Sequence, residues 1–136
     1  MKRVLRALAL AAALGGAGSC GDGTGPVAGV LTVSLQTPNP GADGAILLTV
    51  KSPMTVLGPS VPTSVTAASG LRVFLLTPLA ATNHFAVTGP LPNGAILTIG
   101  VPDVSRAGQY SVTIQDVAAT DFTLRALGGY ALTISR

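Results

Sequence analysis

The sequence is poor in the residues that build most catalytic and metal centres. Its 136 residues include one cysteine, one histidine, no tryptophan and no glutamate, and only 10% of them are charged. A single cysteine excludes an intramolecular disulfide framework and any cysteine-rich metal site. The one histidine, His84, lies in the segment TNHF, and the chain has no Gly-x-Ser-x-Gly elbow to supply a nucleophile. We therefore predict that the protein is not an enzyme and uses no cofactor.

The charges that are present form no basic surface. The net charge is +3, but Lys2, Arg3 and Arg6 lie at the N-terminus, and after Cys20 five basic residues balance five acidic ones. Without a stripe of lysine and arginine to neutralise phosphates, nucleic-acid binding is excluded. The hydrophobic content of 48% and the mean hydropathy of +0.59 exclude a disordered charged tail.

The first 20 residues have the pattern of an export signal. Basic residues open the chain, an uncharged stretch starts at residue 7, and the small residues Ala17, Gly18 and Ser19 precede Cys20. The apolar run over residues 7–14 is shorter than the roughly 18 to 20 residues that a membrane-spanning helix needs. The segment resembles a bacterial lipoprotein signal peptide, whose lipobox ends in small residues followed by cysteine. The resemblance implies cleavage after Ser19, a diacylglyceryl thioether on Cys20 and acylation of the new N-terminus.

Lipidation at Cys20 predicts the location and the domain organisation. Residues 1–19 are the signal peptide, residues 20–27 are the lipidated cysteine and a flexible tether, and residues 28–136 are the folded domain. Because two or more acyl chains hold a protein on a membrane, we expect a bacterial outer-membrane or cell-surface protein. Ala17 stands where leucine is commoner, so cleavage by the ordinary signal peptidase stays open as the alternative. That cleavage would give a periplasmic or secreted protein with a free thiol.

From residue 28 onward the chain has the pattern of short strands separated by turns. Apolar and polar residues alternate over residues 31–36, 110–115 and 130–135, as in strands with one buried face. Continuous apolar runs over residues 45–50, 71–76 and 95–101 indicate central strands covered on both faces. The Asn93-Gly94 pair predicts a β-hairpin between the strands at residues 85–87 and 95–101. A short helical turn is expected within residues 118–127, and residues 58–70 are the loosest loop or edge.

These segments predict an all-β fold, a single antiparallel β-sandwich of roughly seven to nine strands. The order of elements resembles the jelly-roll or cohesin-like sandwiches of the cohesin and carbohydrate-binding-module group. The resembling stretches are VLTVSLQT, DGAILLTVKS, NGAILTIGVP, SVTIQDVAATD and YALTIS. The resemblance implies the fold and not a ligand, because one fold hosts many unrelated functions.

The aspartates are single residues, mostly at turns. Asp43 and Asp103 stand in turn-like segments, where aspartate caps its own backbone. A Ca²⁺ site near Asn39 and Asp43, or near Asp116 and Asp121, is an alternative, but neither stretch has the dense oxygen spacing of an EF-hand loop. Asp116 and Asp121 are also the only candidates for a glycosidase carboxylate pair, and the aromatic-lined cleft that such a pair needs is not indicated. We predict no metal site.

Exposed aromatic rings are the platforms on which proteins stack sugars. Tyr110 and Tyr130 are in register with the apolar residues of their strands, so we expect their rings to lie on the core face. Phe122 and Phe85 are then the candidates for a stacking platform, with a glycan as the alternative ligand.

With so few charges, the surface must carry apolar patches, which mark protein contacts. The main expectation is a non-enzymatic, lipid-anchored module that binds a protein partner.

Overall fold

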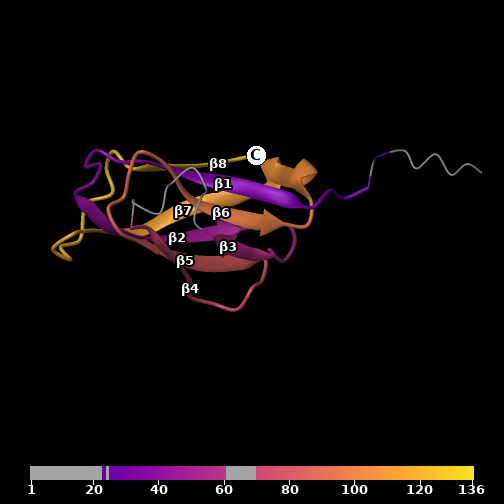
Figure 1. Ribbon diagram of the computed structural model, residues 1–136, viewed down its shortest axis with the longest axis horizontal. Coiled ribbons are helices and arrows are strands. Elements are labelled where there is room, and N and C mark those ends of the chain that lie inside the picture. Colours follow the sequence, from indigo (N-terminus) through magenta and orange to yellow (C-terminus); the bar gives the residue numbers. More distant parts are fainter. Residues whose placement is uncertain (1–22, 24, 61–69) are drawn as a thin grey trace, which may run out of the picture.

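The computed structural model describes residues 23, 25–60 and 70–136. Within them, two four-stranded antiparallel sheets pack face to face (Figure 1). Sheet A has the strand order β3-β6-β1-β8, and sheet B has the order β4-β5-β2-β7. This arrangement confirms the predicted all-β sandwich. The strands are β1 (Gly29–Gln36), β2 (Asp43–Lys51), β3 (Gly58–Ser60), β4 (Arg72–Leu75), β5 (Thr82–Thr88), β6 (Gly94–Val101), β7 (Ser111–Ala119) and β8 (Ala131–Ser135).

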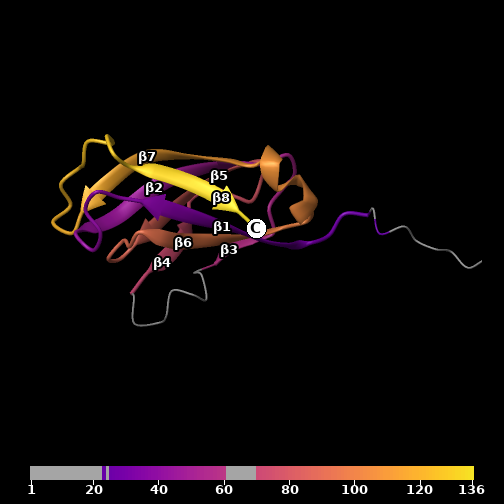
Figure 2. The same ribbon diagram turned by 90° about the horizontal axis from the view of Figure 1, so that it is seen from above.

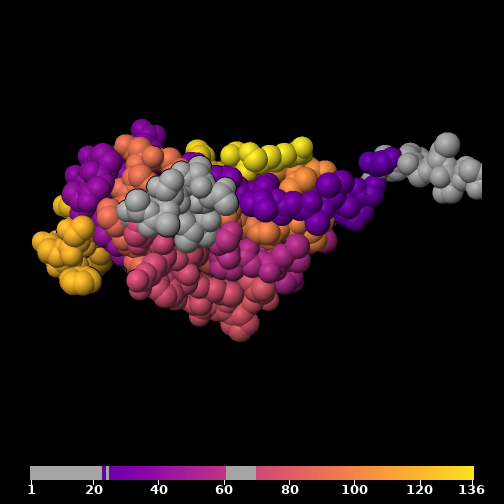
Figure 3. Space-filling model, in the orientation of Figure 1, coloured from indigo at the N-terminus to yellow at the C-terminus, as the bar shows by residue number. Residues whose placement is uncertain are grey.

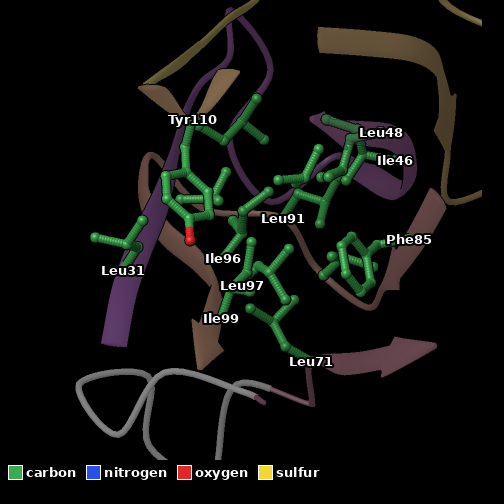
Figure 4. Close-up of a cluster of buried hydrophobic side chains, with 14 of the residues drawn as sticks. Leu31, Ile46, Leu48, Leu71, Phe85, Leu91, Ile96, Leu97, Ile99 and Tyr110 are labelled. Carbon is green, nitrogen blue, oxygen red and sulfur yellow. The ribbon is translucent and has the colours of Figure 1, made fainter. Parts of the chain in front are cut away.

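Alternating apolar residues build the core between the sheets. Leu31, Val33 and Leu35 of β1 are buried, while Thr32 and Ser34 between them are half-exposed on the outer face. The predicted alternations in β7 and β8 are confirmed in the same way. Figure 4 shows leucine, isoleucine and aromatic side chains from both sheets meeting in this core.

The expectation of strands covered on both faces is wrong, because each sheet buries only one face. Residues 45–50 and 95–101 do lie in central strands, β2 and β6. Residues 71–76 do not, because among the described strands β4 stands at the edge of sheet B and pairs with β5 alone. Its outward side chains are therefore open to solvent, and Phe74 is 47% exposed.

The predicted hairpin at Asn93-Gly94 is also wrong, since β5 belongs to sheet B and β6 to sheet A. Residues 89–93 cross from one sheet to the other. Leu91 donates its N–H to the carbonyl of Asp43 and accepts the N–H of Gly41. The Asn93 side chain accepts the N–H of Thr37 at 2.7 Å. These contacts hold residues 89–93 against the start of β2 and the loop before it. The segment is therefore fixed in place although the strands on its two sides do not pair with each other.

The predicted helical turn over residues 118–127 is absent from the structure. Residues 118 and 119 end β7 instead, and Leu124 forms an isolated antiparallel bridge with Ala118. The helical segment is the 3₁₀ helix η2 (Val104–Gln109), which Asp103 caps by accepting the N–H of Ser105. The capping role expected of Asp103 is confirmed. Residues 58–60 form the edge strand β3, and the rest of the predicted loop lies outside the described residues.

The sandwich has two distinct ends along its long axis. The segment leading from residue 25 enters β1 beside η2, where Val104 donates its N–H to the carbonyl of Val27. We call this the tether end. The loops over residues 37–42, 89–93 and 120–130 gather at the opposite end, the loop end (Figures 1 and 2). In the space-filling view the gold loop of residues 120–130 protrudes at the loop end (Figure 3). In the described part of the chain, no helix has the length and apolar character needed to cross a bilayer.

Candidate functional site

An open hollow lies at the loop end of sheet B, and we call it the Phe122 hollow. Its volume is about 280 Å³. Phe122 forms one wall and is 90% exposed. No charged side chain lines it, and its polar groups are those of two threonines. The lining residues are Gly44, Ala45, Thr88, Gly89, Pro90, Ala119, Thr120 and Phe122.

The backbone of Phe122 is strained. Its φ of 68° makes it the one non-glycine residue with positive φ among the residues described. A bulky residue in this left-handed region costs on the order of 1–3 kcal/mol and persists only where its surroundings fix it. Asp121 supplies part of this fixation, because its carboxylate accepts the N–H of Thr123 at 3.0 Å and also the Thr123 hydroxyl. The hydrogen bond from the Thr123 side chain lowers the pKa of Asp121. The strained loop thus holds the ring out in solvent.

A buried carboxylate fastens the same loop to the sandwich. Asp43 is 0% exposed, and its Oδ2 accepts the Thr37 hydroxyl at 2.5 Å and the Tyr130 hydroxyl at 2.9 Å. Its Oδ1 accepts the Nε–H of Arg125 at 3.1 Å. The turn-capping role predicted for Asp43 is wrong, because its carboxylate accepts hydrogen bonds from three side chains and caps no backbone N–H among the described residues. Local sequence does not reveal this network, since Arg125 and Tyr130 are more than 80 residues from Asp43.

Two glycines let backbones approach closely beneath the hollow. A Cβ on Gly44 would lie 2.9 Å from Cα of Thr120, and one on Gly89 would lie 2.6 Å from the carbonyl oxygen of Gly70. Gly89 also has a φ of 115°. A larger residue at Gly44 would therefore push the loop of Phe122 away from β2, and one at Gly89 would displace the segment that leads into β4.

The structure separates the aromatic residues that the sequence grouped. Phe122 is exposed, as its role as a candidate platform requires, whereas Phe85 is wholly buried in the core and cannot stack on a ligand. Tyr110 lies in the core as expected, and Tyr130 is partly buried and packs against the core cluster. Phe74 was missed as an exposed ring because its apolar run was interpreted as a central strand.

His84 belongs to a polar cluster on the outer face of sheet B. Its Nδ1 lies 3.0 Å from Oγ1 of Thr49, and Nε2 of Gln115 donates to the same oxygen at 2.6 Å. Because Thr49 accepts from Gln115, its hydroxyl hydrogen is free to point to His84. Among the described residues, no carboxylate is hydrogen-bonded to the imidazole. The arrangement ties three neighbouring strands together.

The aspartates considered as metal ligands are engaged separately. Asn39 donates to the Tyr130 hydroxyl that in turn donates to Asp43, so both oxygens of Asp43 are already occupied. Asp116 lies on the outer face of β7, whereas Asp121 caps its own loop. Over residues 23, 25–60 and 70–136, no three histidine, cysteine or acidic residues gather where they could hold a metal ion.

The predicted lipidation site, Cys20, lies outside the described residues. The continuously described chain begins at residue 25, and the segment that enters β1 from there lies at the end of the sandwich opposite the loops that hold the Phe122 hollow (Figure 1). No family model, no curated protein and no solved structure matches this chain.

Proposed function

We propose that the protein is a non-enzymatic, lipid-anchored protein of the bacterial outer membrane or cell surface that presents its β-sandwich as a protein-interaction module. One observation carries the proposal: the exposed Phe122 hollow lies at the end opposite the tether. With Cys20 as the anchor, a strand of eight residues separates the two ends by roughly 26 Å. The hollow then faces away from the anchoring membrane, where a partner can reach it.

The chemistry of the hollow favours an uncharged, apolar group of a protein partner. Its walls are aliphatic, glycine and proline surfaces beside one aromatic ring. Exposed aromatic residues beside a pocket are the usual anchors of protein interfaces. The fixed conformation of the Phe122 loop also lowers the conformational entropy that binding would cost.

A carbohydrate-binding module displayed on the cell surface is the second candidate. The specific observation in its favour is the flat, exposed ring of Phe122 beside two threonine hydroxyls, Thr88 and Thr120. A sugar would stack on the ring and take its few hydrogen bonds from these threonines. The resemblance to carbohydrate-binding sandwiches noted in the sequence agrees with this candidate.

In-cell crosslinking and pull-down of the intact chain tests the main proposal. We expect one dominant envelope protein, captured by the wild type and lost in Phe122→Ala. Val30→Ala is the matched control, because Val30 is a 54% exposed apolar residue at the tether end. Capture of lipids and abundant porins alone would contradict a protein partner. Binding on a glycan array that is lost in Phe122→Ala would then support the second candidate.

A separate experiment tests the anchor. Cys20→Ala should move the protein from the membrane fraction to the soluble fraction, because no acyl chain can then be attached. Ser111→Ala, which changes an exposed residue of the sandwich, should leave it in the membrane fraction. A Cys20→Ala chain that stays on the membrane would end the lipoprotein proposal.

A further inference from the structure

The two outer faces of the sandwich differ in chemistry. The outward residues of sheet A are mostly hydroxyl-bearing, namely Thr32, Ser34, Ser60, Thr98, Thr133 and Ser135. The outward residues of sheet B are largely apolar at the loop end and in its middle, namely Ala45, Leu47, Phe74, Ala86 and Ala118. An apolar face of this kind marks a contact surface.

Strand register arranges the apolar residues of sheet B in two neighbouring rows. One row crosses all four strands through Phe74, Ala86, Leu47 and Asp116. The next row, toward the loop end, crosses them through Arg72, Thr88, Ala45 and Ala118. The small side chains leave a shallow hollow of about 140 Å³, bordered by both rows. The face therefore has a depression on its β2 and β7 side and an exposed ring, Phe74, on the opposite edge strand β4.

Opposite charges stand at the two edges of this face. Arg72 is on the edge strand β4 and Asp116 is on the edge strand β7. Within the described part of the chain, neither takes part in a salt bridge. Their rows are two residues apart, about 7 Å along the strands, which an arginine side chain can span. Lys51 is the other charged residue on this face, and it lies at the tether end of β2, outside both rows.

We propose that the outer face of sheet B binds the same face of a second copy of this chain. A two-fold axis parallel to the strands, between β2 and β5, places β4 of one copy over β7 of the other. Each row then meets the same row of the partner, so Phe74 lies opposite the partner's Asp116. Arg72, one row nearer the loop end, reaches that carboxylate diagonally, and the symmetry-related ion pair forms at the other edge. The apolar residues of β5 and β2 meet between these two ion pairs. Such a contact is isologous and closed, and it uses the aligned packing by which twisted sheets normally stack.

The orientation of the tethers agrees with this symmetry. An axis parallel to the strands leaves both copies with the same end-to-end direction. In one chain the N-terminal segment and the loop end lie at opposite ends of the sandwich (Figure 2). In the dimer both N-terminal segments therefore leave from one end, as two chains anchored in one membrane require, and both loop ends lie at the other. The dimer face shares Ala45 and Thr88 with the Phe122 hollow, so a second copy narrows the hollow from the side of sheet B. The contact does not require the hollow to be a binding site, so the two proposals can fail separately.

Crosslinking through an introduced cysteine tests the contact. Leu47→Cys, in the full chain expressed in bacterial cells, places a thiol beside the proposed axis. A short bismaleimide should give more product of dimer size than the wild-type chain gives. The wild-type yield measures any crosslinking through the native Cys20. Thr32→Cys on the outer face of sheet A is the matched control and should not exceed that background. No dimer product from Leu47→Cys, or an equal yield from Thr32→Cys, would overturn the proposal.

Charge exchange then tests whether the occupant is a second copy. In the Leu47→Cys chain, Arg72→Asp or Asp116→Arg should each lower the dimer yield by about tenfold, because each replaces attraction by repulsion. The double exchange should restore the yield, since the pairs form again with reversed signs. Failure of the double exchange to restore it, or a product containing a different protein, would overturn the second copy as occupant. If a reversal lowers the amount of folded protein, the neutral Arg72→Gln and Asp116→Asn variants should lower the yield in the same direction.

Discussion

Replacing Tyr110 by phenylalanine should stabilise the protein. The Tyr110 side chain is buried in the core, with 5% of the residue exposed, and its hydroxyl has no hydrogen-bond partner among the described residues (Figure 4). A buried hydroxyl without a partner costs about 1–3 kcal/mol of desolvation. Phenylalanine keeps the ring and its packing while removing the oxygen, so we expect a gain of about 1 kcal/mol in the free energy of unfolding. For a domain of this size, that gain raises Tm by roughly 4 °C.

The same substitution at Tyr130 is the matched control and should act in the opposite direction. The Tyr130 hydroxyl donates to Asp43 at 2.9 Å and accepts from Asn39 at 2.9 Å. Its removal leaves a buried carboxylate with one donor fewer. Hydrogen bonds to charged groups contribute about 1.5–3 kcal/mol, so Tyr130→Phe should lower the free energy of unfolding by about that amount.

Urea unfolding followed by far-UV circular dichroism measures both changes, because the chain has no tryptophan to report by fluorescence. The midpoint should shift in opposite directions for the two variants while the slope m stays constant. A Tyr110→Phe variant that is destabilised as much as Tyr130→Phe would refute the reasoning, since the Tyr110 hydroxyl would then have a partner.

The same residue predicts the alkaline behaviour. Burial raises the pKa of Tyr110, and the nearby charge of Asp103 adds to the rise. The unfolded chain therefore loses this proton at lower pH than the folded chain. The stabilisation is complete below the ordinary tyrosine pKa of about 10 and is lost as pH rises through the raised pKa. Tyr110→Phe should flatten this alkaline decline.

Three further changes test the loop end and the tether end. Arg125→Ala should lower the free energy of unfolding by about 2–3 kcal/mol, because it leaves the buried Asp43 carboxylate without its ion-pair partner. Chemical denaturation measures this loss. Phe122→Gly should raise stability by about 1 kcal/mol while abolishing partner capture, because glycine tolerates the positive φ; thermal melting and the pull-down check the two effects. Asp103→Asn should flatten the acid decline in Tm that begins as pH falls below the ordinary carboxyl pKa of about 4. The hydrogen bond from the Ser105 side chain lowers the pKa of Asp103, so its contribution is present above the ordinary carboxyl pKa and is lost as pH falls through the lowered one.

Local pattern predicted the strands but not their partners. The alternation around Val33 and around Leu132 follows directly from one buried and one wet face, so these strands could be found without the structure. The Asn93-Gly94 pair supplies the conformational freedom of a turn, but turn propensity does not specify which sheet the next strand joins. That choice depends on contacts such as Leu91 with Asp43, which lie far apart in the sequence.

The candidate site was predictable only in part. Phe122 could be picked out because it follows a strand pattern without belonging to it. Phe74 was misjudged because an apolar run does not reveal whether its strand is central or at an edge, and Phe85 because the residues around it do not reveal which face of its strand is buried. Asp43 was the least predictable residue. An aspartate before glycine is typical of a turn. The residues around Asp43 do not predict its hydrogen bonds with the distant Arg125 and Tyr130.

The neighbours of the first strand set the order in which this molecule can form. β1 is made early, yet it pairs only with β6 and with β8, the last strand of the described chain. Sheet A therefore cannot close until about a hundred further residues have been synthesised, and such distant pairings form slowly. This delay suits a protein exported as we propose, because an unfolded chain is the form that can be threaded through a membrane and left to fold on the far side.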